Sequence, residues 1–215
     1  MIPDWPSERA EMVERQLRKR GIRDERVLAA MASIRREEFL PLELRVASYR
    51  DGPAAIGAGQ TISQPYMTAL MAQELALEGT ENVLEIGAGS GYAAAVSGAL
   101  AARVIAMELL PALARMAERN LAKAGVGGNV TIVCADGSQG FPEGAPYDGI
   151  SVAAAAPEVP PRLLDQLADG GRLVIPVGDY ADQELRVIIR EGGRLRTRVS
   201  THCRFVPLRG VQGFR

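Results

Sequence analysis

The chain is poor in the residues that carry most acid–base, redox and metal chemistry. Its 215 residues include one histidine, two cysteines and one tryptophan, and aromatic residues make up 5%. Cys134 and Cys203 lack the short spacings of metal ligands, so we expect two reduced thiols and no metal site. No Ser–His–Asp set or close carboxylate pair is recognisable. His202 stands next to Cys203, far in sequence from the glycines at 87–91, and we expect it to be structural or exposed.

The chain also lacks an excess of either charge and any long apolar run. It has 25 basic and 26 acidic residues and a net charge of −1. Nucleic-acid-binding proteins usually carry a basic excess, so we expect no nucleic-acid partner. No stretch approaches the ~18 apolar residues of a membrane span, and the first residues lack the basic and apolar regions of a signal peptide. We therefore expect a cytoplasmic monomer without membrane contact.

The pattern of the chain changes near residue 81. Before it we expect helices at 7–21, with Ser7 as N-cap and Gly21 as the end, at 24–34, capped by Asp24, and at 66–77. The stretch 49–66 has the proline and glycine content of an ordered but irregular segment.

After residue 81, apolar strands alternate with helical stretches. This alternation predicts an α/β fold with a doubly wound, mostly parallel sheet. Gly192-Gly193 predicts a β-hairpin over 184–199, which would form an antiparallel edge. The other expected elements are strands at 82–89, 103–109, 129–136, 147–156 and 172–178, and helices at 90–102, 111–125 and 160–171.

The stretch "EIGAGSGY", residues 85–92, places three glycines between a predicted strand and a helix. Glycine lets a ligand approach the backbone, and a helix N-terminus offers unpaired N–H groups. The spacing is not that of a dinucleotide fingerprint, which would put glycine at Tyr92, nor that of a P-loop. Glu108 and Asp136 end the next two strands. One edge of the sheet thus carries a glycine loop, a carboxylate suited to ribose hydroxyls and an Asp-Gly pair.

This arrangement resembles the Rossmann-like class of S-adenosylmethionine-dependent methyltransferases. The resemblance implies that S-adenosyl-L-methionine is the cofactor and that the glycine loop lies against its methionine part. It also implies that Glu108 holds the ribose and that the residues around Asp136 meet the adenine. An NAD-linked oxidoreductase is the alternative, because it shares the first acid but usually has the other glycine spacing.

The segment "GQTISQPYM", residues 59–67, narrows the choice. Together with "VLEIGAGSGY", "YDGISVAAAAPEVPPRLLDQLADGGRLVIPVG" and "RFVPL", it closely resembles the protein-L-isoaspartate O-methyltransferases. These repair enzymes methylate the free carboxylate of isoaspartyl residues, so isoaspartyl-containing proteins and peptides are the expected partners. The similarity extends from Met12 to Leu208. It implies a single methyltransferase domain, 1–215, with N-terminal helices and a substrate loop in 1–80 and a Rossmann-like core in 81–215.

The resemblance also implies roles for individual residues. Ser63 would be the catalytic residue and Thr61 would lie beside it in the substrate pocket, which Phe205 and Pro207 would close. The expected cofactor-binding residues are Gln60, Ile62, Gly87, Ala88, Gly89, Ser90, Gly91, Glu108, Asp136 and Gly137.

The chain departs from the family at a few positions, while Arg36 and Phe39 match. Glu37 replaces a histidine, Ala54-Ala55 stands where Leu-Pro is common, and Ala153 replaces a threonine. We expect these departures to alter pocket shape and peptide preference, and not the reaction class.

The methyl transfer implied by the resemblance needs few catalytic groups. A carboxylate has a pKa near ~4 and is already ionised at neutral pH, so it needs positioning and not a general base. Uncharged hydroxyls can orient it while leaving the attacking oxygen its electron density. A non-catalytic adaptor, which would bind the cofactor without methylating anything, is a further alternative.

Overall fold

A seven-stranded sheet forms the centre of the molecule. The computed structural model describes residues 3–214, so residues 1, 2 and 215 of the predicted single domain lie outside it. The strands of the sheet are β3 (Asn82–Ile86), β4 (Arg103–Glu108), β5 (Val130–Cys134), β6 (Tyr147–Val152), β7 (Leu167–Gly178), β8 (Gln183–Glu191) and β9 (Arg194–Cys203).

The spatial order of these strands is β5-β4-β3-β6-β7-β8-β9. The strands from β5 to β7 run parallel, and β8 and β9 are antiparallel to their neighbours. The mostly parallel sheet with an antiparallel hairpin at one edge is therefore confirmed, including the turn at Gly192-Gly193.

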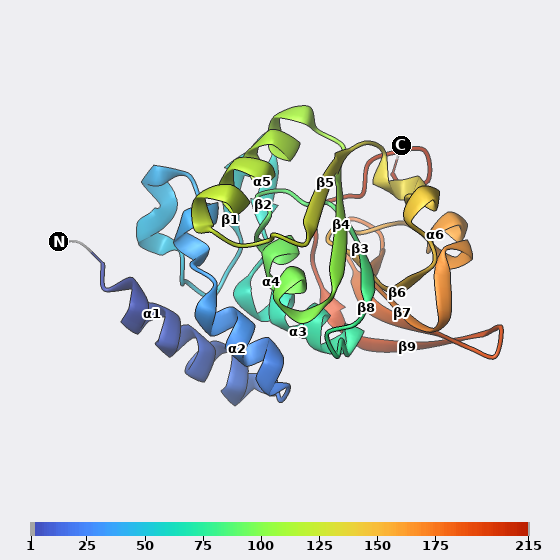
Figure 1. Ribbon diagram of the computed structural model, residues 1–215, viewed down its shortest axis with the longest axis horizontal. Coiled ribbons are helices and arrows are strands. Elements are labelled where there is room, and N and C mark those ends of the chain that lie inside the picture. Colours follow the sequence, from blue (N-terminus) through green and yellow to red (C-terminus); the bar gives the residue numbers. More distant parts are fainter. Residues whose placement is uncertain (1–2, 215) are drawn as a thin grey trace.

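Helices pack on the sheet, and the N-terminal helices lie beyond it (Figure 1). Figure 1 shows the N-terminal helices at one end of the molecule and the β8–β9 hairpin at the other. No helix formed by residues 3–214 is long and apolar enough to cross a membrane. The α-helices are α1 (Trp5–Glu11), α2 (Glu25–Ser33), α3 (Pro65–Leu75), α4 (Tyr92–Leu100), α5 (Pro111–Ala124) and α6 (Pro161–Asp165).

The side chains of the apolar strands pack into two hydrophobic cores, one on each face of the sheet. Successive side chains of a strand point to opposite faces. Val83 and Val104 accordingly pack with the N-terminal helices and with α3, α4 and α5. Their neighbours Leu84 and Ile105 pack on the other face with α6 and with Leu208 of the C-terminal segment. Burial of both faces explains why most residues of these strands are apolar.

The first helix begins earlier than predicted, and the second begins where expected. Asp4, not Ser7, caps α1, because its carboxylate accepts hydrogen bonds from the backbone N–H and the hydroxyl of Ser7. The helix continues through π-helical and 3-10 turns and ends at Gly21, which has a φ of +100° as the predicted C-cap requires. Asp24 caps α2 by accepting from Arg26 and Val27.

The predicted helix over 160–171 is wrong in its second half. Helix α6 ends at Asp165, and β7 already begins at Leu167. The side chain of Gln166 accepts from the backbone N–H of Phe141 and donates to the backbone carbonyl of Gln139. The backbone carbonyl of Gln166 accepts from the backbone N–H of Tyr147. These contacts bring the chain back into the sheet, and no local sequence signal announces them.

The segment 49–66 is more regular than predicted. It contains a short antiparallel hairpin of β1 (Ala54–Gly57) and β2 (Gln60–Ile62). Ile56 and Ile62 are its buried residues, and they anchor the hairpin to the core of the N-terminal helices. The hairpin delivers the next residue, Ser63, to the start of α3.

Candidate active site

The loop between β3 and α4 carries the three glycines. The N–H groups of Gly87 and Ala88 donate to the carbonyl of Met107 at 2.8 and 3.0 Å, which holds the loop against β4. Gly91 is the N-cap of α4 with a φ of +86°, and a Cβ at this position would lie 3.2 Å from Ala117 of α5. The third glycine therefore serves the packing of two helices, a role that the third glycine also has in dinucleotide-binding folds.

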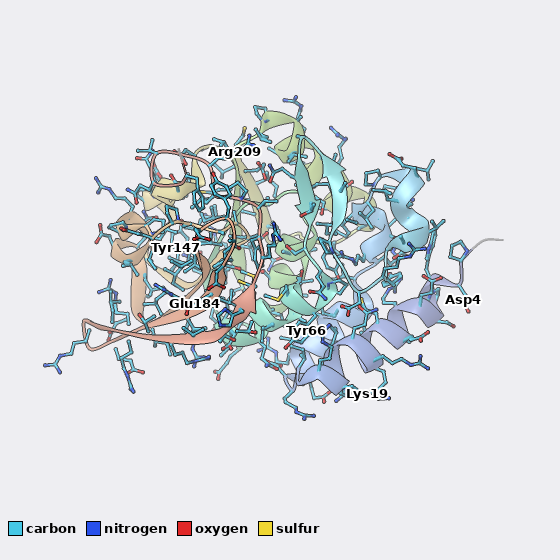
Figure 2. The ribbon with its side chains drawn as sticks, turned by 180° about the vertical axis from the view of Figure 1, so that it is seen from behind. Asp4, Lys19, Tyr66, Tyr147, Glu184 and Arg209 are labelled. Carbon is cyan, nitrogen blue, oxygen red and sulfur yellow. The ribbon has the colours of Figure 1, made fainter. Side chains whose placement is uncertain are left out.

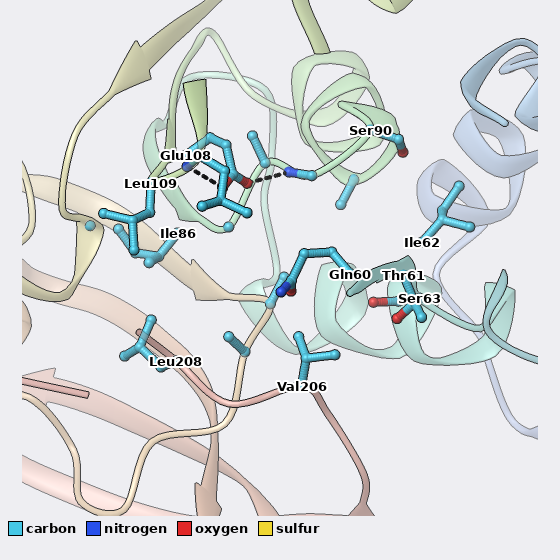
Figure 3. A pocket seen from close by; sticks show the side chains of 18 of the residues that line it. Gln60, Thr61, Ile62, Ser63, Ile86, Ser90, Glu108, Leu109, Val206 and Leu208 are labelled. Atoms are coloured by element: carbon cyan, nitrogen blue, oxygen red, sulfur yellow. Dashed lines mark hydrogen bonds between the residues drawn. The ribbon is translucent and has the colours of Figure 1, made fainter. Parts of the chain in front are cut away.

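Glu108 ends β4 and completes the loop. Glu108 as a whole residue is 7% exposed. One oxygen accepts from the N–H of Gly89 at 2.9 Å and the other accepts from the N–H of Leu110 at 2.9 Å (Figure 3). A carboxylate has about four acceptor sites, so each oxygen can accept a further hydrogen bond. The carboxylate can thus bind two neighbouring hydroxyls while it holds the loop.

A first cavity opens between this loop, the end of β4, the segment 60–63 and the C-terminal segment 206–209. Together with the open solvent at its mouth, it comprises about 830 Å³ of space. The sequence-predicted residues that line it are Gln60, Thr61, Ile62, Ser63, Gly87, Ala88, Gly89, Ser90, Glu108, Gly137 and Pro207.

Three predicted site residues do not line this cavity. Gly91 packs against α5, as described above, and Phe205 lines a neighbouring groove. Asp136 directs its carboxylate to the N–H groups of Ser138 and Val211, each at 2.9 Å. In this structure Asp136 fastens the C-terminal segment to the end of β5, so its contact with a ligand stays a prediction.

A wide groove lies on the outer side of the segment 60–63, between the N-terminal helices and β9. Together with the open solvent above it, the groove comprises about 1320 Å³ of space, and its lining residues include Arg20, Tyr66, His202 and Arg204. Figure 2 shows Tyr66 between the N-terminal helices, which carry Lys19, and the hairpin that carries Glu184. The groove is large enough for several residues of an extended peptide.

Ser63 stands where the first cavity and the groove meet. Thr61, Ser63 and Ala153 line both spaces. In Figure 3 the hydroxyl oxygens of Thr61 and Ser63 point to the same side of their segment. The predicted catalytic and substrate-binding hydroxyls thus lie between the first cavity and the groove. Phe205 and Val206 also line the groove, and the Phe205 backbone N–H donates to the side-chain oxygen of Gln183 at 2.7 Å.

A third, smaller cavity lies behind Ser63. Thr68, Glu85 and Ser97 line it together with Ser63 and Ala153. Glu85 lies in the middle of β3 and is 1% exposed. One of its oxygens accepts from Ser97 Oγ at 3.4 Å, and the other has no hydrogen-bond partner among residues 3–214. Burial raises the pKa of Glu85 to about 8, so its side chain is uncharged at neutral pH.

We expect Glu85 to make the stability of the protein fall as the pH rises. The folded pKa of about 8 lies above the unfolded value near ~4.3, so between these values only the folded state keeps the proton. The unfolding free energy should therefore decrease by up to about 1.4 kcal/mol per pH unit in this window and level off above it. Glu85→Gln should remove this slope, as measured by urea denaturation at pH 5.5, 6.5 and 7.5.

Glu118→Gln is the matched control, because Glu118 is an exposed residue of α5. It should keep the slope of the unchanged protein. Identical slopes in the Glu85 variant and the unchanged protein would show that Glu85 is ionised in the folded state.

Several residues at the site have no distinguishing signal in the sequence. Thr68, Tyr92, Leu109 and Val206 line the first cavity but belong to patterns that also fit an ordinary core. Glu85 is an exception, because an acid inside the apolar run "NVLEI" is a detectable signal of a special role. Sequence reasoning missed it.

The departures from the family pattern occupy defined places. Ala153 lies at the junction of all three cavities, where a larger side chain would take up space. Glu37 is buried and binds Arg9 at 3.0 Å and the hydroxyl of Tyr49. Ala54-Ala55 belongs to β1. Only Ala153 is therefore placed to change the shape of the site directly.

Comparisons with known proteins agree with this geometry. The family model for protein-L-isoaspartate(D-aspartate) O-methyltransferase matches residues 7–213. The chain is 52% identical over 207 residues to the protein-L-isoaspartate O-methyltransferase of Methanoculleus marisnigri, covering 96% of this chain and 94% of the relative. It is 48% identical over 210 residues to that of Herpetosiphon aurantiacus, covering 98% and 93%.

Two solved structures share the whole fold. A protein-L-isoaspartate O-methyltransferase superposes with a TM-score of 0.82 at 31% identity, covering 95% of this chain and 67% of the other. A Plasmodium falciparum protein described as such a methyltransferase, in complex with S-adenosyl-L-homocysteine, gives a TM-score of 0.80 at 27% identity and covers 97% and 99%. By sequence and by structure, the chain belongs to the protein-L-isoaspartate(D-aspartate) O-methyltransferase family.

Proposed function

We propose that this protein transfers the methyl group of S-adenosylmethionine to the free carboxylate of L-isoaspartyl residues in damaged proteins and peptides. The single observation that carries the proposal is the position of Ser63 and Thr61 between the cavity at the glycine loop and the wide groove. A methyl transfer to a peptide needs such a junction, because donor and acceptor must meet while both remain held.

The first cavity fits S-adenosylmethionine. The two unused acceptor sites of Glu108 suit the two hydroxyls of its ribose, and the glycine loop beside them suits its methionine part. Gln60 and Ile62 line the cavity from the substrate segment, and Gly137 lines it near the end of β5. Bound S-adenosylmethionine supplies a methyl group on a sulfonium centre, which any well-placed nucleophile can accept.

The groove and its hydroxyls suit an isoaspartyl acceptor. The free carboxylate is already ionised at neutral pH, so the protein has only to orient it and exclude water. Ser63 and Thr61 can donate hydrogen bonds to one carboxylate oxygen, while the other keeps its electron density and accepts the methyl group. Phe205 and Pro207 lie at the edges of the two spaces and would close them over the peptide.

The histidine takes no part in this scheme. His202 lies on the rim of the groove, is largely exposed, and its Nδ1 lies 3.2 Å from a carboxylate oxygen of Asp182. An ionised carboxylate has no proton for it to remove, so we assign it a surface role.

Two other functions make different predictions. An NAD-linked oxidoreductase would bind nicotinamide and transfer hydride. A non-catalytic adaptor would bind S-adenosylmethionine and leave every peptide unmodified. The groove beside Ser63 favours the methyltransferase, because neither alternative needs a peptide-sized space that opens onto the cofactor cavity.

Replacing Ser63 by alanine tests the assignment of the catalytic residue. Ser63→Ala should lower single-turnover methyl transfer to an isoaspartyl peptide by roughly tenfold, because the carboxylate loses one orienting hydrogen bond. Calorimetry should find the affinity for S-adenosylmethionine nearly unchanged. Ser33→Ala is the matched control, because Ser33 is an exposed residue of α2 whose hydroxyl binds the carbonyl of Ala30 in its own helix. It should behave like the unchanged protein. An unchanged rate in the Ser63 variant would remove Ser63 from the site.

The remaining expectations extend the proposal. The free thiols Cys134 and Cys203 are compatible with a cytoplasmic location. The expected monomer, the absence of a nucleic-acid partner and the division into a substrate part, 1–80, and a core, 81–215, stay predictions.

A further inference from the structure

Arg36 is a buried cation directly behind the proposed catalytic residue. It begins the 3-10 helix η3 (Arg36–Phe39) and is 1% exposed. Its Nε donates to the carbonyl of Ser48 at 2.8 Å, and its Nη2 donates to the carbonyl of Ser63 at 2.8 Å. The guanidinium carbon lies 4.9 Å from the ring centroid of Tyr92, which lines the first cavity. One side chain thus joins the substrate segment to the helix that follows the glycine loop.

No acidic residue neutralises this charge within residues 3–214. The neighbouring Glu37 is bound to Arg9 and Tyr49. Glu38 forms ion pairs with Arg45 and Lys123. Arg36 itself has no ion pair in the described chain, and its Nη1 lacks a hydrogen-bond partner there. Burial lowers the pKa of Arg36, but an arginine starts high enough to keep its proton.

Hydrogen bonding to the carbonyls of Ser48 and Ser63 does not by itself require a charged side chain. Neutral amides can satisfy backbone carbonyls, whereas burying an uncompensated cation carries a large desolvation penalty. Glu85, which lines the cavity behind Ser63, is uncharged at neutral pH and does not cancel the charge. Within residues 3–214 the charge therefore has no counterion, and the groove beside Ser63 is where a substrate carboxylate would enter.

We infer that Arg36 is a positioning residue, which fixes Ser63 and supplies the positive charge by which the site prefers a carboxylate over its uncharged methyl ester. The inference rests on the proposed function. The Ser63 peptide group separates the guanidinium from the acceptor, so the carboxylate is attracted without a direct cationic hydrogen bond. The attacking oxygen keeps its electron density, and the attraction ends once the ester has formed, which favours release of the product.

The size of the effect follows from Coulomb's law. Charges ~7 Å apart at an effective dielectric constant of ~20 interact strongly enough to change an affinity by about 10- to 50-fold. The measurement compares two peptides that differ in one group, an isoaspartyl peptide and the same peptide with the free carboxylate replaced by a carboxamide. Calorimetry with S-adenosylhomocysteine present prevents turnover and removes the sulfonium charge. The unchanged protein should bind the carboxylate peptide at least about tenfold more tightly.

Two substitutions separate charge from positioning. Arg36→Gln removes the charge and should abolish the preference between the two peptides. Arg36→Lys keeps the charge but cannot hold both carbonyls with a planar fork, so it should keep the preference while the turnover number falls. Arg190→Gln is the control, because Arg190 is a half-buried arginine that donates to a backbone carbonyl, that of Leu164, and forms no ion pair within residues 3–214. It should lower thermal stability and leave the preference intact.

Three results would overturn the inference. They are equal affinity of the unchanged protein for both peptides, a preference that persists in Arg36→Gln, and a loss in Arg36→Lys as complete as in Arg36→Gln. If Arg36→Gln does not fold, two comparisons still decide: the unchanged protein has to prefer the carboxylate peptide, and Arg36→Lys has to keep that preference. A protein that methylates no isoaspartyl peptide at all would refute the proposed function instead, so the two failures are distinguishable.

Discussion

Glu108→Ala is expected to weaken the binding of S-adenosylmethionine by roughly 30- to 150-fold, which corresponds to about 2–3 kcal/mol. The carboxylate would lose two charge-assisted hydrogen bonds to the ribose. It would also release the N–H groups of Gly89 and Leu110, which it holds at 2.9 Å. Loss of these contacts loosens the loop that has to be in place before the cofactor binds. Calorimetric titration with S-adenosylmethionine and with S-adenosylhomocysteine measures the change.

Two further variants define the cause of this loss. Glu108→Gln keeps the shape and one acceptor oxygen, so its affinity should lie between those of the unchanged protein and Glu108→Ala. Glu118→Ala removes an exposed carboxylate from α5 and should leave the affinity unchanged. Tight binding by Glu108→Ala would mean that the ribose lies elsewhere in the cavity.

Much of the fold was predictable because its signals are local. Gly21 ends its helix because glycine readily adopts a positive φ, and Asp24 begins the next helix because its side-chain oxygen accepts from backbone N–H groups. Gly192-Gly193 turns the hairpin because both residues adopt a positive φ. The parallel sheet follows from apolar strands alternating with helices. Helix α6 was predicted too long because Gln166 is held by residues about 25 positions away in the chain. Such a contact exists only after folding.

The candidate site was predictable where motif and geometry coincide. The glycine loop and Glu108 come together because consecutive parallel strands end at one edge of the sheet. Ser63 was singled out by family resemblance, since nothing physical in "TIS" distinguishes it from a turn. Asp136 looked like a ligand-binding acid, but its partner Val211 lies 75 residues away and could not be foreseen. Burial of Arg36 and Glu85 likewise depends on packing between distant segments.

The largest discrimination should be between isoaspartyl and aspartyl peptides of otherwise identical sequence. In an isoaspartyl residue the main chain continues through the β-carbon, which displaces the free carboxylate by about a bond length. Misplacement of a reacting group on the order of 1 Å can lower a rate by ~10²-fold. The groove and the first cavity meet at Thr61, Ser63, Ala153 and Val206, so the acceptor carboxylate has to reach this junction to meet the methyl donor. We therefore expect the aspartyl peptide to be methylated at least ~10²-fold more slowly.

Methyl transfer from labelled S-adenosylmethionine to this pair of peptides tests the central claim most directly. The quantity to compare is kcat/KM for each peptide. The product is identified as a methyl ester because mild base hydrolyses it and releases labelled methanol. The account predicts rapid labelling of the isoaspartyl peptide and a rate at least ~10²-fold lower for its aspartyl twin. Equal rates on the two peptides, or no labelling of the isoaspartyl peptide by a folded protein that binds S-adenosylmethionine, would contradict it.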